Sequence, residues 1–160
     1  SKIIEKFNEL QKEATELGFP ICLNTQTSVP LELYWHDDYD GRILVDKELQ
    51  EINQVFIPIF SSKDAFLIQF AQKLIHNNGS QITVLDAAGH IRSNREIQES
   101  IRSIEQIAPN HIMMMQERTI KKEFLQSQDL MIISLESWKK LIDSQSPWLN
   151  NTPSVLIVKP

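Results

Sequence analysis

Short apolar runs punctuate the chain from Val55 onward and predict a set of buried strands. Each run holds apolar residues at consecutive positions instead of alternating ones, which is typical of strands covered on both faces. The runs are VFIPIF (55–60), QITVLD (81–86), HIMMM (111–115), LMIIS (130–134) and SVLIV (154–158).

Amphipathic segments separate these runs and predict helices. The first carries Leu67, Phe70 and Leu74 on one face, and the others span about 93–108, 119–127 and 136–143. Regular alternation of buried strands and helices predicts an α/β fold: a doubly wound, mainly parallel five-stranded sheet with helices on both faces. A ligand would then sit at the carboxyl ends of the strands, where the strand order reverses.

Two residue types within the strands call for specific placements. Pro58 removes a backbone donor from the first run, so we expect a bulge or an irregular strand end there. Met113, Met114 and Met115 are expected to be core residues beneath helices on both sides. Trp35, Trp138 and Trp148 fit either a core or an interface.

The first 50 residues follow a different pattern and predict a separate extension. Residues 3–17 have helical spacing that ends at Gly18, and residues 19–26 form a short strand-like run. LELYW (31–35) and RILVD (42–46) flank an acidic turn, which predicts a hairpin or a loop that crosses to a parallel strand. We therefore divide the chain into an extension, 1–50, and an α/β domain, 51–160.

Composition narrows the choice of partner. The net charge is −5 and the pI is about 5.4 over 160 residues, so no basic surface favours nucleic acid or an anionic membrane. Cys22 is the single cysteine, which excludes an internal disulfide and favours a reducing compartment. No apolar run reaches the roughly 20 residues of a membrane span, and no signal peptide pattern is present, so we expect a soluble chain.

Catalytic and metal motifs are not prominent in the sequence. The four histidines share no metal-ligand spacing on one expected element, so we expect no metal and no cofactor. The acidic turn WHDDYD (35–40) fits a solvated turn better than a cation site, because it lacks the ordered alternation of a calcium loop. No Gly-x-Ser-x-Gly elbow occurs, and we expect that the chain is not an enzyme.

Five polar residues at strand ends are the candidate ligand-binding residues. Ser61, Ser62 and Asp64 follow the first strand of the domain, Asp86 ends the second and Ser134 ends the fourth. At one edge of the sheet they would hydrogen-bond a ribose or another small polar ligand. Helix caps and loop residues are the commoner role for these residue types, and Asp64 in particular fits a cap of the helix that follows it.

The order of elements resembles the universal stress protein fold. More specifically, residues 55–74 (VFIPIFSSKDAFLIQFAQKL) are similar to the start of the second universal-stress-like unit in the cytosolic tail of monovalent cation/proton antiporters. GRILVDKEL (41–49) resembles the closing strand of the first such unit, and WLNNTPSVLIVKP (148–160) resembles the closing segment of the second.

This resemblance implies a regulatory domain at the cytoplasmic face of an integral membrane antiporter. Its partners would be the transmembrane transport domain of the same polypeptide, a small-molecule ligand and a second copy in a homodimer. SVLIV (154–158) is expected to be an edge strand, covered by dimerisation or by residues 29–49. The alternative is a free-standing nucleotide-binding universal stress protein, which the lack of glycine between Ser134 and Ser154 disfavours.

Overall fold

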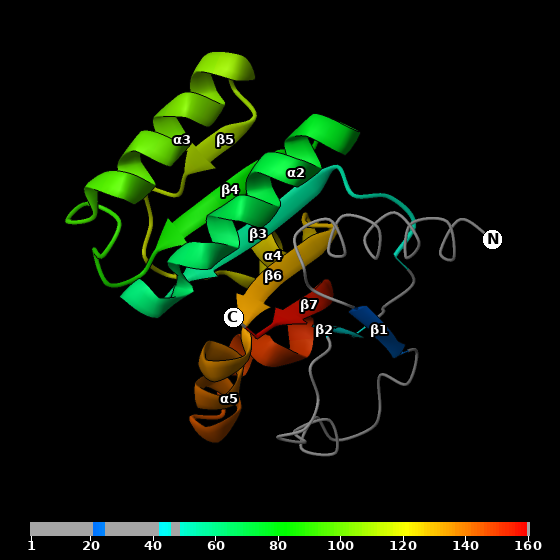
Figure 1. Ribbon diagram of the computed structural model, residues 1–160. Coiled ribbons are helices and arrows are strands. Elements are labelled where there is room, and N and C mark those ends of the chain that lie inside the picture. Colours follow the sequence, from blue (N-terminus) through cyan, green and yellow to red (C-terminus); the bar gives the residue numbers. More distant parts are fainter. Residues whose placement is uncertain (1–20, 25–41, 46–48, 160) are drawn as a thin grey trace.

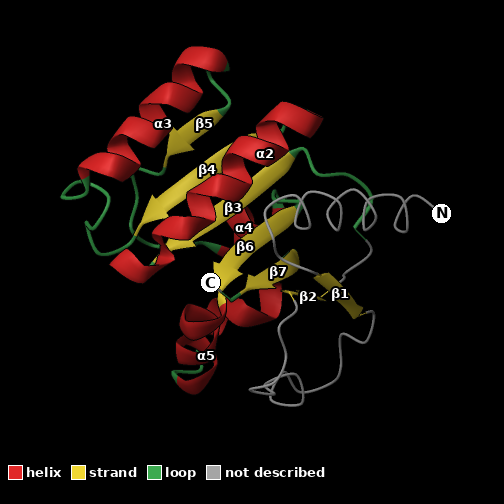
Figure 2. Ribbon diagram, viewed as in Figure 1, coloured by secondary structure: helices red, strands yellow, loops and turns green. Residues whose placement is uncertain are grey.

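Seven strands form one sheet in the computed structural model, which describes residues 21–24, 42–45 and 49–159 (Figures 1 and 2). The strands are β1 (Ile21–Asn24), β2 (Arg42–Val45), β3 (Gln54–Ile59), β4 (Gln81–Asp86), β5 (Ile112–Met114), β6 (Leu130–Ser134) and β7 (Ser154–Val158). The helices are η2 (Ser62–Leu67), α2 (Ile68–Asn78), α3 (Arg95–Ile107), α4 (Lys122–Gln126), α5 (Leu135–Asp143) and η3 (Pro147–Asn151). The helix expected at 3–17 and the run 31–35 lie outside the described residues.

The strands β3 to β7 are mutually parallel and lie in the order β7-β6-β3-β4-β5. The chain starts at the centre of this set, moves through β4 to β5, and then returns to lay β6 and β7 on the other side of β3. The predicted doubly wound sheet is therefore confirmed, and its strand order reverses between β3 and β6.

Alternate residues of the strands supply two separate cores, which explains the continuously apolar runs. Val55, Ile57 and Ile59 belong to the core beneath α2 and α3. Phe56 belongs to the core on the opposite face, where α4 and α5 pack and where its ring meets Phe124 edge to face at 5.0 Å. Figure 2 shows the helices on both faces of the sheet.

The two tryptophans in the described part of the domain are core residues. Trp138 is buried in the cluster beneath α4 and α5, and Trp148 packs against the same cluster. Trp35 lies outside the described residues.

Pro58 is accommodated where the ladder between β3 and β6 ends. These two strands pair only through Val55 and Phe56, two residues before the proline. On the other side the register with β4 continues without a break through Pro58 and Leu85. An early end of one ladder therefore replaces the bulge, and it lets β3 and β6 diverge at the point where their order reverses.

Local signals define the ends of the two longest described helices. Gly79 ends α2 with a positive φ of 65°, a conformation that glycine adopts without strain. Asn94 begins α3, and its Oδ1 accepts a hydrogen bond of 3.2 Å from the Ile97 amide. These helices have 11 and 13 residues, and no described helix is long and apolar enough to cross a bilayer.

Residues 154–158 form β7, the end strand of the five parallel strands, and its outer side is covered by a strand from within residues 29–49. β7 pairs with β6 on one side and, antiparallel, with β2 on the other, where Leu44 faces Leu156. A segment from the N-terminal part thus covers β7 within the same chain, as the intramolecular alternative anticipated. A homodimer stays a prediction.

The expectation that all three methionines are core residues is wrong. Among the described strands β5 pairs with β4 alone, which makes it the edge strand at its end of the sheet. Met113 is 63% exposed, whereas Met114 and Met115 are half-buried. Consecutive apolar residues indicate burial on both faces only for strands inside a sheet.

We predict that Leu156→Ala lowers the free energy of unfolding by about 2–5 kcal/mol, because Leu156 is fully buried between β2 and β6. Met113→Ala removes a side chain of similar size from an exposed position and should cost less than about 0.5 kcal/mol. Urea denaturation of both variants measures the difference. Equal losses would contradict the placement of β5 at the edge and β7 inside.

Candidate functional site

The crevice at the reversal of strand order lies between the carboxyl ends of β3 and β6. On one side, β3 leads through Phe60 and Ser61 into the short helix η2. On the other side, β6 passes directly into α5 at Ser134, with no loop between strand and helix. A doubly wound sheet binds its ligands in this crevice, so the side chains that fill it decide whether a ligand can enter.

A buried carboxylate fills the centre of the crevice. Asp64 is 1% exposed, and its Oδ2 accepts hydrogen bonds from the amides of Phe60 (2.9 Å) and Ser61 (3.3 Å). The same oxygen accepts a third hydrogen bond of 2.8 Å from the hydroxyl of Ser137 on α5. A carboxylate removed from water needs such donors, because a buried charge without partners is costly. Asp64 therefore joins the end of β3 to the start of α5.

Ser134 and Ser137 bring α5 up against the end of the sheet. The Oγ of Ser134 accepts a hydrogen bond of 3.2 Å from the Ser137 amide and caps the helix. Both serines are buried. α5 begins directly after β6, at the position where a nucleotide site would need a glycine-rich loop to admit phosphates.

The structure brings four of the five predicted site residues together. Ser61, Asp64 and Ser134 meet around Ser137, and the exposed Ser62 starts η2 beside them. Asp64 and Ser134 have the capping role that is common for these residue types. Ligand binding by the set stays a prediction. Sequence reasoning missed Ser137, whose only signal is its position three residues after a capping serine.

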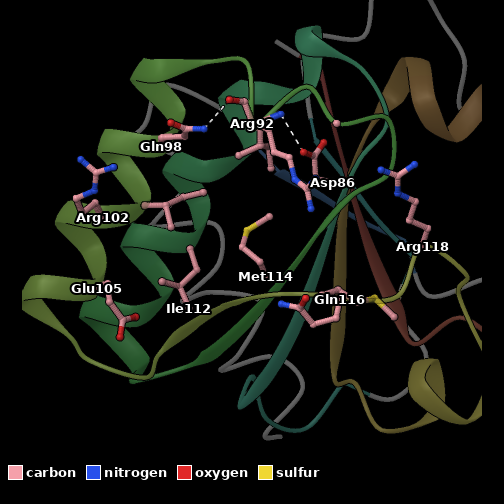
Figure 3. Close-up of a pocket in the computed structure, with 13 residues that line it drawn as sticks. Asp86, Arg92, Gln98, Arg102, Glu105, Ile112, Met114, Gln116 and Arg118 are labelled. Atoms are coloured by element: carbon pink, nitrogen blue, oxygen red, sulfur yellow. Dashed lines mark hydrogen bonds between the residues drawn. The ribbon is translucent and has the colours of Figure 1, made fainter.

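The fifth predicted residue, Asp86, lies apart from this group and lines an open cavity of about 600 Å³. The cavity is bounded by α3, by the loop after β4 and by β5 with the residues that follow it (Figure 3). We call it the arginine cavity. Its charged lining residues are Asp86, Arg92, Arg102, Glu105 and Arg118.

Asp86 has one oxygen engaged and one without a partner. Its Oδ2 accepts a hydrogen bond of 3.1 Å from the Ile91 amide, which holds the loop after β4 against the strand end. Its Oδ1 is buried and has no hydrogen-bond partner among the described residues. A carboxylate oxygen can only accept, so a ligand would satisfy it by donating an N–H or O–H.

The three arginines give the arginine cavity a positive balance. Arg92, Arg102 and Arg118 are exposed and form no ion pair with any residue in the described ranges. Three guanidinium groups against two carboxylates leave a formal charge of +1, although the whole chain carries −5. Glu105 is engaged elsewhere, since its Oε1 accepts a 3.0 Å hydrogen bond from the Asn110 amide.

The remaining candidate chemistry is scattered. Within residues 49–159 and the two short N-terminal strands, no three His, Cys, Asp or Glu side chains gather as a metal site would require. The Nδ1 of His111 lies 3.1 Å from the carbonyl oxygen of Ser80, which is a structural contact. The acidic turn 35–40 lies outside the described residues.

Comparisons with known proteins find no matching family model, no matching curated protein and no matching solved structure. The resemblance to the universal-stress-like tail of an antiporter therefore stays a prediction. It rests on the quoted segments and on the order of elements, of which the doubly wound sheet is established here.

We predict that the chain does not bind ATP in the crevice between β3 and β6, because Asp64, Ser134 and Ser137 fill it with satisfied hydrogen bonds. Isothermal titration should detect no low-micromolar ATP binding. Low-micromolar binding that persists in Arg92→Ala, a variant of the neighbouring arginine cavity, would contradict this prediction and favour a free-standing nucleotide-binding protein.

Proposed function

We propose that this chain is a regulatory domain in the cytosolic tail of a membrane cation/proton antiporter, and that it acts by domain packing or ligand sensing and not by catalysis. Such a domain shifts the equilibrium between two states of the transporter, and its effect is limited by its difference in affinity for the two states. The transported ion would not bind to this domain.

The observation that carries the proposal is the set of hydrogen bonds that Asp64 accepts from the same chain at the crevice between β3 and β6. This crevice is where a doubly wound sheet usually binds its ligand. Here Asp64 accepts three hydrogen bonds from groups of the same chain. This arrangement favours a structural use of the fold over nucleotide chemistry. It agrees with the resemblance of this chain to an antiporter tail unit and with the lack of glycine between Ser134 and Ser154.

A second feature supports packing within a larger assembly. β2 lies antiparallel against β7, so a strand from the segment that resembles a preceding unit is built into the sheet of this one. Resemblance of residues 41–49 to the closing strand of a preceding unit would explain this pairing. Tandem units joined through such a sheet would transmit displacement as one body.

The arginine cavity supports the ligand-sensing part of the proposal. It is lined by both the loop after β4 and α3, so a bound ligand would contact two elements at once. Gln98 on α3 already donates a hydrogen bond of 2.6 Å to the Arg92 carbonyl in that loop. A ligand that strengthens this contact would bias the position of α3 relative to the sheet.

We expect the encoded full-length protein to carry apolar membrane-spanning segments and to exchange a monovalent cation for protons in everted membrane vesicles. A truncated protein that ends before residue 49, and so lacks the α/β domain, should still exchange ions. The pH or cation concentration at which exchange is half-activated should change, because regulation and transport reside in separate domains. Fluorescence quenching of a ΔpH probe measures both. A full-length protein without spanning segments, or an unchanged activation profile after truncation, would contradict the proposal.

A further inference from the structure

The arginine cavity combines three features that select one class of ligand. Its guanidinium groups form no ion pair within the described part of the chain, a buried carboxylate oxygen has no hydrogen-bond partner there, and its floor is apolar. Figure 3 shows Arg92 beside Asp86, Arg118 on the far side of Asp86, and Met114 and Ile112 below Arg92 on the side of Glu105. Each feature constrains a different part of the ligand.

The guanidinium groups require an anion. Arg92 follows β4 and Arg118 follows β5, so the two approach the cavity from separate segments. Guanidinium groups offer several N–H donors in a plane and match the oxygens of phosphate. Arg102 on α3 has its guanidinium turned away from the centre of the cavity in Figure 3, so we assign it to the rim.

Asp86 requires a hydrogen-bond donor next to that anion. Its Oδ1 is buried without a partner, while its Oδ2 is already held by the Ile91 amide. Bare phosphate would bring negative charge against this carboxylate and leave the oxygen unsatisfied. A ligand with a hydroxyl group near its phosphate would satisfy both, because the hydroxyl donates to Asp86 and separates the two anions. Since Oδ1 is buried, this contact requires the side chains around Asp86 to move when the ligand binds.

The apolar floor of the arginine cavity favours a ligand with a carbon skeleton. Ile112 is buried, Met114 and Ile101 are half-buried, and all three line the cavity. Apolar surface of this kind gains free energy when a carbon skeleton displaces water from it. The volume of about 600 Å³ is that of a small-molecule site and not of a single ion.

From these features we infer that the arginine cavity binds a hydroxylated phosphate monoester, with its phosphate on Arg92 and Arg118 and a hydroxyl group donating to Asp86. The site is distinct from the crevice between β3 and β6. The inference deepens the ligand-sensing part of the proposed function and rests on it for its regulatory meaning. Binding itself can be measured on this chain alone.

The test uses ribose 5-phosphate and adenosine monophosphate as probes, with inorganic phosphate and ribose as partial ligands. Isothermal titration should give saturable binding for at least one ester. Each partial ligand should bind at least about tenfold more weakly, since it makes only one of the two polar contacts. Tighter binding of ribose 5-phosphate identifies a sugar phosphate as the source, and tighter binding of adenosine monophosphate identifies a nucleotide whose base covers the floor.

Matched variants separate this site from general attraction to arginine. Arg92→Ala and Asp86→Ala should each weaken binding of the ester by about tenfold or more, the expected loss of one charge-assisted hydrogen bond. Arg95→Ala removes an exposed arginine from the same helix region outside the cavity and should change affinity less than about twofold. Raising the salt from about 50 to about 200 mM should weaken the wild type, because the arginines are exposed.

Two results would overturn the inference. One is the absence of saturable binding by both esters, and the other is equal loss of affinity in Arg92→Ala and Arg95→Ala. Circular dichroism of each variant, with a melting temperature equal to that of the wild type, keeps a folding defect from imitating lost binding. Failure here would leave the antiporter proposal standing, since that is tested by ion exchange and not by ligand titration.

Discussion

One buried carboxylate organises the functional end of this sheet. Asp64 takes three hydrogen bonds at the point where β3 and β6 diverge, two from the backbone after β3 and one from Ser137 on α5. Removing any of these donors would leave a charge in a nearly dry environment, which is strongly unfavourable. The turn after β3, the direct passage of β6 into α5 and the closed crevice all depend on this contact.

The polar groups at the crevice between β3 and β6 bond to one another. The groups that could contact a ligand lie one strand further along the sheet, at the end of β4. The carboxyl end of β4 lines a cavity, and one oxygen of Asp86 there has no hydrogen-bond partner in the described ranges. The edge position of β5 leaves space beside α3, which the three arginines and the apolar floor line. The ligand site that we propose for this doubly wound domain is the arginine cavity, between α3 and the edge of the sheet.

The sequence predicted the five strands of the domain and their parallel arrangement because burial on two faces leaves continuous apolar runs such as residues 130–134. It left open whether residues 29–49 or a second copy covers residues 154–158, and it did not predict that β5 is an edge strand. The pairing of β2 with β7 joins residues more than 100 positions apart, and no local pattern encodes such a contact. Met113 was misplaced for the same reason, since an edge strand and an inner strand share the same apolar residues.

The candidate site was predictable only in part. Strand-end position alone selected Asp64, Ser134 and Asp86, and two of these proved to be caps whose oxygens are engaged. Ser137 and the arginines were not found, because a serine in a helix and arginines on three separate segments carry no spacing signal. Ser137 and the arginines reach their sites only through the packing of α5 and α3 against the sheet.

Hydrogen exchange at the amides of Phe60 and Ser61 tests the central claim most directly. Both amides follow the last residue of β3 and would exchange quickly if the end of the strand faced an open crevice. Bonded to Asp64, they should be protected almost as strongly as the amide of Ile57 inside the strand, and Ser137→Ala should reduce that protection selectively. Exchange of both amides at the rate of an unstructured peptide would contradict the closed crevice and the account built on it.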